Sequence, residues 1–214
     1  WCKPDFVYWD IECWYPGALD APNCIRCLEG QKKSGKAMSE FLTDCGTEHF
    51  RDLKDAVKRG SEGGKMPIVG SYNNHMTHPV HSRVIDFRKI YPKYLDESQP
   101  SLYVCGRALD VHKAIRGNYK LLNKKRDTLP WLTAGCYGEF EPYKLEQMIL
   151  ETLLNGGKGI TYYWYGDFDN PLEFYYHAKA LKEIAPYENI IVKGEVLEPS
   201  GLNKLLTYSG VKKG

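Results

Sequence analysis

The sequence predicts an α/β fold with a parallel sheet, and three observations support this. Short apolar segments typical of β-strands alternate with longer segments of helical periodicity. A crossover between parallel strands needs a connecting segment, usually a helix, so the alternation favours parallel pairing. The strand segments are also short and apolar, as expected of a sheet covered by helices. A chain of 214 residues with 43% hydrophobic residues can form one domain with a sizeable core.

The first half of the chain contains three predicted strands and one long predicted helix. The strands are expected at residues 5–12, 66–72 and 101–106, each beginning near a proline. A helix is expected at residues 36–59 because apolar residues recur there at helical spacing. The glycine-rich residues 60–64 end this helix.

The second half continues the alternation. A helix is expected at residues 108–125, followed by strands at 130–137 and 159–165. The clearest helix lies between these strands, where EPYKLEQMILETLL carries an apolar stripe and Asn155-Gly156 ends it. Pro171 begins the last helix, at residues 172–184, and Pro186 stops it.

Seven cysteines bear on the compartment and on possible cross-links. Four of them lie between residues 13 and 45, a pattern that favours disulfides in a secreted protein of the extracellular space or secretory pathway. The alternative is that Cys24-x-x-Cys27 forms half of a zinc site, although no second pair follows at a suitable spacing. The odd number leaves a free thiol unless a missing segment supplies its partner.

Charge and hydropathy argue against several classes of function. The net charge is +2 with basic residues scattered among acids, whereas a nucleic-acid face needs clustered basic residues. No apolar run reaches the roughly 18 residues of a membrane helix. His75, His78 and His81 are interrupted by Pro79, which favours a polar loop over a metal site. No cofactor is expected.

Polar and aromatic residues follow the carboxyl ends of the predicted strands, where the functional residues of parallel α/β folds gather. They are Asp10, Glu12 and Trp14 after the first strand, Tyr72 and Asn73 after the second, Arg107 after the third, Tyr137, Glu139 and Glu141 after the fourth, and Trp164, Asp167 and Asp169 after the fifth. The amino ends carry only prolines and a glycine. This asymmetry predicts a functional site at the carboxyl edge.

Glycoside hydrolysis is the chemistry that suits this set of residues, because it needs a carboxylic acid and a second group that stabilises or attacks the sugar. Glu12 suits the acid, since a carboxylate as near as Asp10 would raise its pKa. Trp14, Tyr137 and Trp164 offer surfaces on which sugars stack. Tyr72, Asn73, Arg107 and Asp167 offer hydrogen bonds to hydroxyl groups. Asp10 could instead be a buried acid bonded to the backbone, and Glu139 could simply favour the start of a helix.

Two segments carry a resemblance to known glycosidases. Residues 145–186, LEQMILETLLNGGKGITYYWYGDFDNPLEFYYHAKALKEIAP, resemble the second half of TIM-barrel glycosidases. Residues 5–12, DFVYWDIE, are similar to the D-x-x-D-x-D-x-E strand of family 18 chitinase-like glycosidases. That similarity implies that Glu12 is the general acid and that Asp10 orients the N-acetyl group of the substrate as an internal nucleophile. A second resemblance, to retaining glycosidases, implies Glu12 as acid and Glu139 as nucleophile.

The resemblance implies that residues 1–190 form strands 4–8 of a (β/α)8 barrel and that residues 191–214 are a tail or the start of a further domain. Because the chain begins at Trp1 beside a strand, we expect a processed product or fragment. Half a barrel exposes two sheet edges, so the N-terminal half of the same barrel or a second copy would complete it. The expected ligand is a carbohydrate substrate. The alternative function is that of a catalytically silent carbohydrate-binding or structural subunit.

Overall fold

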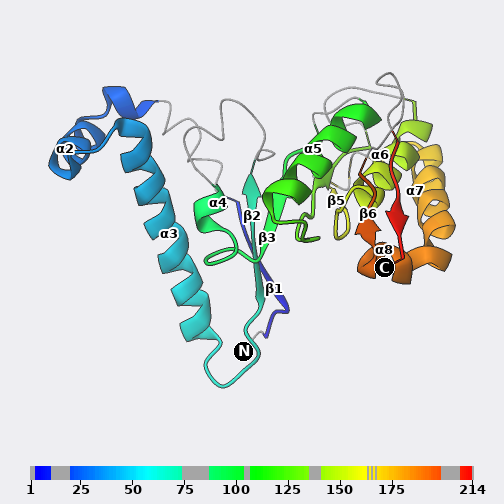
Figure 1. Cartoon of the computed structure of the whole chain (residues 1–214), viewed down its shortest axis with the longest axis horizontal. Coiled ribbons are helices and arrows are strands. Elements are labelled where there is room, and N and C mark those ends of the chain that lie inside the picture. Colours follow the sequence, from blue (N-terminus) through cyan, green and yellow to red (C-terminus); the bar gives the residue numbers. More distant parts are fainter. Residues whose placement is uncertain are drawn as a thin grey trace. The chain divides into compact units, whose positions relative to one another are not determined.

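A computed structural model describes residues 3–10, 20–73, 87–103, 107–134, 141–162, 164, 166, 168–198 and 208–213 (Figure 1). The chain divides into two compact units, Trp1–Gln99 and Pro100–Gly214, here called the N-terminal unit and the C-terminal unit.

The N-terminal unit is built on a three-stranded sheet. Its elements are β1 (Phe6–Trp9), η1 (Ala21–Asn23), α2 (Ile25–Ser34), α3 (Met38–Gly60), β2 (Ile68–Asn73), α4 (Phe87–Ile90) and β3 (Glu97–Pro100). The strand order is β1-β2-β3, and β1 pairs with β2 in parallel, from Phe6 opposite Ile68 to Trp9 opposite Ser71. The parallel pairing of these first two strands is the direction that the strand–helix alternation predicts.

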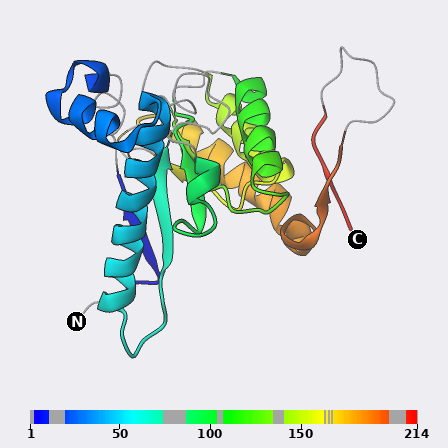
Figure 2. The ribbon, with the colours of Figure 1, turned by 60° about the vertical axis from the view of Figure 1, so that its left-hand side comes forward.

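Two apolar clusters hold the N-terminal unit together. Helix α3 packs on the sheet through a cluster whose buried members are Phe50, Val69, Ile90 and Leu95. Figure 2 shows α3 running along β1 and β2. A second cluster joins η1 and α2 to the start of α3 through Ala21, Leu42, Cys27, Met38 and Phe41. At Gly30 the two helices come so close that a Cβ atom would lie 2.6 Å from the Phe41 ring.

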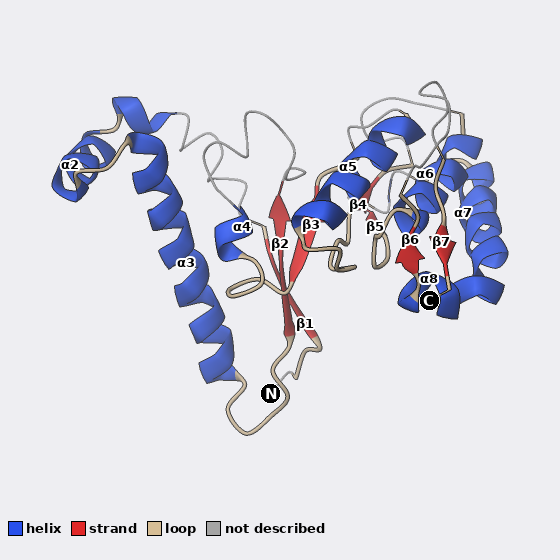
Figure 3. Ribbon diagram, in the orientation of Figure 1, coloured by secondary structure: helices blue, strands red, loops and turns tan. Residues whose placement is uncertain are grey.

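The C-terminal unit is dominated by helices (Figure 3). Its elements are α5 (Ala108–Leu121), β4 (Trp131–Leu132), α6 (Tyr143–Leu154), β5 (Thr161–Tyr162), α7 (Pro171–Ile184), η4 (Ala185–Tyr187), α8 (Glu188–Lys193), β6 (Glu195–Val196) and β7 (Val211–Lys212). β4 pairs with β5 in parallel, and β6 pairs with β7 antiparallel. The core lies between the helices and β4, and its fully buried members include Val111, Ile115, Leu132, Leu145, Met148 and Ile149.

The prediction of barrel strands 4–8 is wrong. Within the described ranges the sheets have only two or three strands, none closes on itself, and the β6–β7 pair is antiparallel. Among the residues that the structure describes in the strands expected at 130–137 and 159–165, only those of the two-residue β4 and β5 form strands. Ladders this short form few hydrogen bonds, so the apolar segments are buried chiefly by packing against α5, α6 and α7. None of the helices in these ranges is both long and apolar enough to cross a lipid bilayer.

Candidate functional site

The carboxyl ends of β1 and β2 meet at the same edge of the N-terminal sheet. Trp9 lies opposite Ser71 in the parallel register. Asp10 follows Trp9 in the sequence, and Tyr72 follows Ser71. The fully buried Ser71 donates its hydroxyl to the carbonyl oxygen of Trp9, at 3.2 Å, which ties the two strands together at this end. Asp10 is exposed and Tyr72 is half-buried. An acid and a phenol that the sequence predicts as site residues therefore lie at the ends of neighbouring strands.

The other predicted site residues of the N-terminal unit follow these strand ends. Asn73 is the last residue of β2. Glu12 and Trp14, like Tyr137, Glu139 and Asp167 of the C-terminal unit, lie outside the described residues. The structure thus places Asp10, Tyr72 and the backbone of Asn73 at one edge of the N-terminal sheet.

Arg107 precedes helix α5 in the C-terminal unit, and its guanidinium pairs with Asp110 in the first turn of that helix. Nε of Arg107 donates to Oδ2 of Asp110 and Nη2 donates to Oδ1, both at 2.8 Å. The Arg107 side chain is 72% exposed, so the forked pair lies at the surface. A sugar hydroxyl that binds Arg107 would have to share this guanidinium with Asp110.

Trp164 follows β5 and presents an aromatic surface. Its side chain is 64% exposed, which is unusual for the largest apolar residue. The backbone of Gly166 lies against the indole, since a Cβ atom at Gly166 would be 2.6 Å from Cζ2 of the ring. A supported and exposed indole has the flat apolar face on which a sugar ring can stack.

An aromatic residue at the end of β5 and another on α7 form a hydrogen-bonded pair, which the sequence did not predict. The hydroxyl of Tyr162 lies 2.6 Å from Nδ1 of His177, and the ring of Phe168 packs edge-on against Tyr162 at 4.7 Å between centroids. Burial raises the pKa of Tyr162 well above its usual range and lowers the pKa of His177. Both groups are therefore neutral near pH 7. The only sequence signal for this pair is the aromatic richness of residues 162–177.

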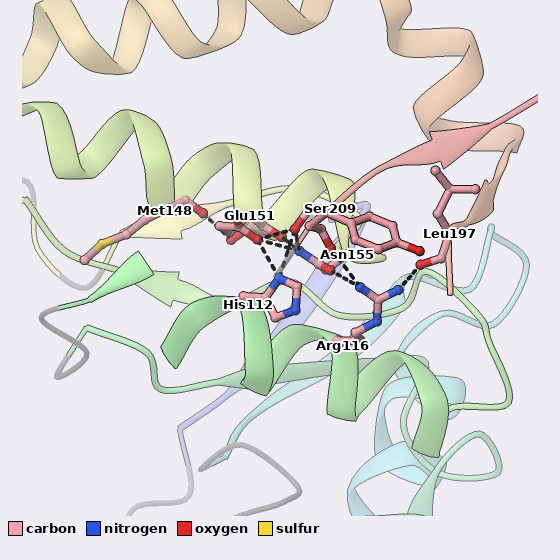
Figure 4. A network of polar contacts seen from close by, with 9 residues as sticks. His112, Arg116, Met148, Glu151, Asn155, Leu197 and Ser209 are labelled. Carbon is pink, nitrogen blue, oxygen red and sulfur yellow. Dashed lines mark hydrogen bonds and ion pairs between the residues drawn. The ribbon is translucent and has the colours of Figure 1, made fainter. Parts of the chain in front are cut away.

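An extensive polar network of side chains in the C-terminal unit joins α5, α6 and the last described segment (Figure 4). Oε2 of Glu151 lies 2.8 Å from Nδ1 of His112 and accepts hydrogen bonds from Nδ2 of Asn155 at 2.8 Å and from the Ser209 hydroxyl at 2.5 Å. Nδ1 of His112 also lies 2.9 Å from Oγ of Ser209. One carboxylate oxygen thus connects two helices and the segment before β7.

Arg116, one turn after His112, extends the network toward β6. Its Nη1 donates to Oδ1 of Asn155 at 3.1 Å and to the carbonyl oxygen of Tyr208 at 3.4 Å. Its Nη2 donates to the carbonyl oxygen of Leu197, as Figure 4 shows. Arg116 is 7% exposed and Asn155 is fully buried. The guanidinium therefore binds the residue after β6 and a residue before β7. We define the C-terminal hairpin as residues 195–198 and 208–213, so Arg116 contacts both of its segments.

Serine, histidine and glutamate together raise the question of a nucleophilic triad. Such a triad needs the acid on one ring nitrogen and the nucleophile on the other, so that the imidazole can pass a proton. Here Glu151 and Ser209 both contact Nδ1 of His112, and the Ser209 hydroxyl donates to Glu151. The network is therefore a structural latch that holds the C-terminal hairpin on α5 and α6. We call it the hairpin latch.

The described part of the chain holds no group of three or more His, Cys, Asp or Glu residues arranged to bind a metal ion. His75, His78 and His81 lie outside that part of the chain. Comparison of the chain with models of protein families, with curated proteins and with solved structures gives no match.

Proposed function

We propose that the chain is a glycoside hydrolase acting on a polysaccharide or oligosaccharide, with Glu12 as general acid. The observation that carries the proposal is the end of β1, where the exposed Asp10 lies beside the end of the parallel strand β2. In the sequence Glu12 follows Asp10 by two residues. The proposal pairs these two carboxyl groups.

In the proposed reaction Glu12 donates its proton to the oxygen of the leaving sugar. An Asp10 carboxylate close to Glu12 would favour the protonated form of Glu12 until that transfer, because two like charges at close range disfavour ionisation. The sugar centre left behind is stabilised by the N-acetyl group of the substrate, which Asp10 orients. Hydrogen bonds to Tyr72 and Asn73, at the end of β2, supply binding.

The test replaces Glu12 by Gln and screens the wild-type and variant chains against a polysaccharide panel with detection of released sugars. We expect Glu12→Gln to abolish release while sugar binding, measured by affinity electrophoresis, stays unchanged. Glu29→Gln, on an exposed position of α2, is the matched control and should leave release unchanged. Turnover retained by Glu12→Gln would remove Glu12 from the acid role.

A catalytically silent carbohydrate-binding protein is the second candidate, and Trp164 is the observation that favours it. The indole is exposed and backed by Gly166, which suits stacking without any acid. Under this alternative the wild-type chain binds a glycan but releases no product. Trp164→Ala should then weaken glycan retention, whereas Tyr187→Ala, which removes another aromatic ring that is 59% exposed, should not.

A further inference from the structure

Three thiols of the N-terminal unit gather where helix α2 packs on α3. Cys24 is the residue before the first turn of α2, Cys27 lies within that turn, and Cys45 lies on α3. All three are free thiols and half-buried, so none is sealed from solvent. Cys27 also packs on the apolar cluster formed by Ala21 and Leu42. This is a group of nucleophilic side chains that the proposed glycosidase chemistry does not use.

Cys24 and Cys27 are in direct contact, and their roles in the contact differ. The carbonyl oxygen of Cys24 accepts from the backbone N–H of Leu28 at 2.9 Å, which fixes Cys24 at the start of the helix. The thiol and the backbone N–H of Cys27 both donate to the sulfur of Cys24. The backbone N–H of Arg26 donates to the same sulfur, so Cys24 accepts three hydrogen bonds, two of them from Cys27.

These contacts separate the three thiols by acidity. The hydrogen bonds from Cys27, followed by the nearby Arg26 charge, lower the pKa of Cys24. The same thiol contact and burial raise the pKa of Cys27. Burial and the charges of Glu48 and Asp44 raise the pKa of Cys45. Cys24 therefore has the largest thiolate fraction near neutral pH, and the thiolate is the form that attacks disulfides.

We propose that Cys24 and Cys27 form a redox-active dithiol that exchanges with disulfides, in which Cys24 is the attacking thiol and Cys27 the resolving thiol. The hydrogen bond between these two free, half-buried thiols at the start of α2 carries the proposal. The proposed exchange needs neither a metal ion nor Cys45. The described residues contain no cysteine or histidine set suited to a metal ion. The proposal is independent of the glycoside hydrolase assignment.

The exchange balances with an external disulfide, RSSR, as oxidant. The Cys24 thiolate attacks one sulfur of RSSR, the S–S bond breaks, and RS⁻ leaves and takes up a proton from water. The thiol of Cys27 then loses its proton to water and attacks the sulfur of Cys24, which expels the second RS⁻. Two cysteine thiols are oxidised to one disulfide while RSSR is reduced to two RSH.

The test equilibrates the whole chain with reduced and oxidised glutathione at several ratios, traps free thiols by acid quench and alkylation, and maps disulfides by mass spectrometry of peptides. We expect a Cys24–Cys27 disulfide that forms in oxidising mixtures and disappears again in reducing ones. A Cys27–Cys45 bridge in the wild-type chain would overturn the proposal, and so would a Cys24–Cys27 pair that stays reduced at every ratio. These outcomes require no variant and therefore do not depend on a variant that folds.

Serine variants then assign the two roles. Cys27→Ser should accumulate glutathione on residue 24 because nothing resolves the mixed disulfide. Cys24→Ser should take up glutathione at Cys27 much more slowly than Cys27→Ser takes it up at Cys24 under the same conditions. Cys45→Ser is the matched control and should still form the Cys24–Cys27 disulfide. Glutathione on Cys27 of Cys24→Ser at the rate seen for Cys24 would contradict the assignment.

Discussion

Because of His177, which is paired with Tyr162, the stability of the C-terminal unit depends on pH. Burial lowers the pKa of His177 in the folded chain, so the unfolded chain binds a proton at a higher pH than the folded chain does. The contribution of this residue to the free energy of unfolding is therefore fully present above the unfolded-state pKa of about 6.5. It is lost as the pH falls through the lower pKa of the folded state.

We predict that His177→Gln removes this part of the pH dependence. Urea unfolding at pH 7.5 and at pH 5 measures it, and the decrease in unfolding free energy between these two values should be smaller in the variant than in the wild-type chain. The variant also loses the hydrogen bond to the Tyr162 hydroxyl, so its stability at pH 7.5 should already be lower. An identical decrease in both chains would rule out a contribution of His177.

At the scale of the elements, the turn after α6 depends on a glycine. Gly156 has a φ of +105°, which side-chain-bearing residues rarely adopt, and a Cβ atom there would lie 2.4 Å from Cδ2 of Tyr119. Tyr119 is buried on α5 and cannot move aside without opening the core. Strain and overpacking therefore act together at this position.

We predict that Gly156→Ala lowers the unfolding free energy by about 2 kcal/mol or more. Gly159→Ala is the matched control, because a Cβ atom there would be 3.1 Å from the mobile end of Leu129 and no positive φ is involved. Thermal unfolding followed by circular dichroism compares the two variants. If both lower the midpoint equally, neither the backbone conformation nor Tyr119 explains the glycine.

The elements that the sequence predicts best are those whose pattern is local. Helix α6 is confirmed at Tyr143–Leu154, and Leu145, Met148, Ile149 and Thr152 are its buried residues. Apolar residues at helical spacing can be recognised without knowing which element the helix packs against. Of the strand expected at 101–106, the described residues 101–103 lie after β3, which spans Glu97–Pro100. The sequence does not indicate β3 because its buried residues Glu97, Ser98 and Gln99 are polar and give no apolar signal.

Part of the candidate site can likewise be predicted from the sequence, and part of it cannot. The parallel ends of β1 and β2 follow from strand alternation, so the sequence predicts that Asp10 and Tyr72 lie at the same edge of the sheet. The hairpin latch does not follow from any local pattern, because its partners are brought together only by tertiary packing. His112 and Arg116 are one turn apart on α5, but Ser209 lies 97 residues after His112.

At the scale of the C-terminal unit as a whole, the hairpin latch makes the end of the chain part of the core. We predict that a chain ending at Gly194 is less stable by about 1–3 kcal/mol, since it leaves the buried Arg116 without the carbonyl groups of Leu197 and Tyr208. The truncated chain also loses Val196, which is 3% exposed. Chemical denaturation of the full and truncated chains measures the difference.

Arg116→Ala, made in both chains, is the control for this truncation. In the full chain it should lower stability, because it removes donors from two carbonyl groups and from Asn155. In the truncated chain its cost should be smaller, since two of the three acceptors are already gone. Equal costs in both chains would show that the hairpin does not act through Arg116.

The residues of the hairpin latch are far apart in the sequence, so they are synthesised at different times. Glu151 and Asn155 leave the ribosome well before Ser209, whose hydroxyl they bind. Domains can fold from the N-terminal side while synthesis continues. The N-terminal unit can therefore fold during translation, whereas α5 and α6 keep His112 and Arg116 without their last partners until residues 208–209 have emerged.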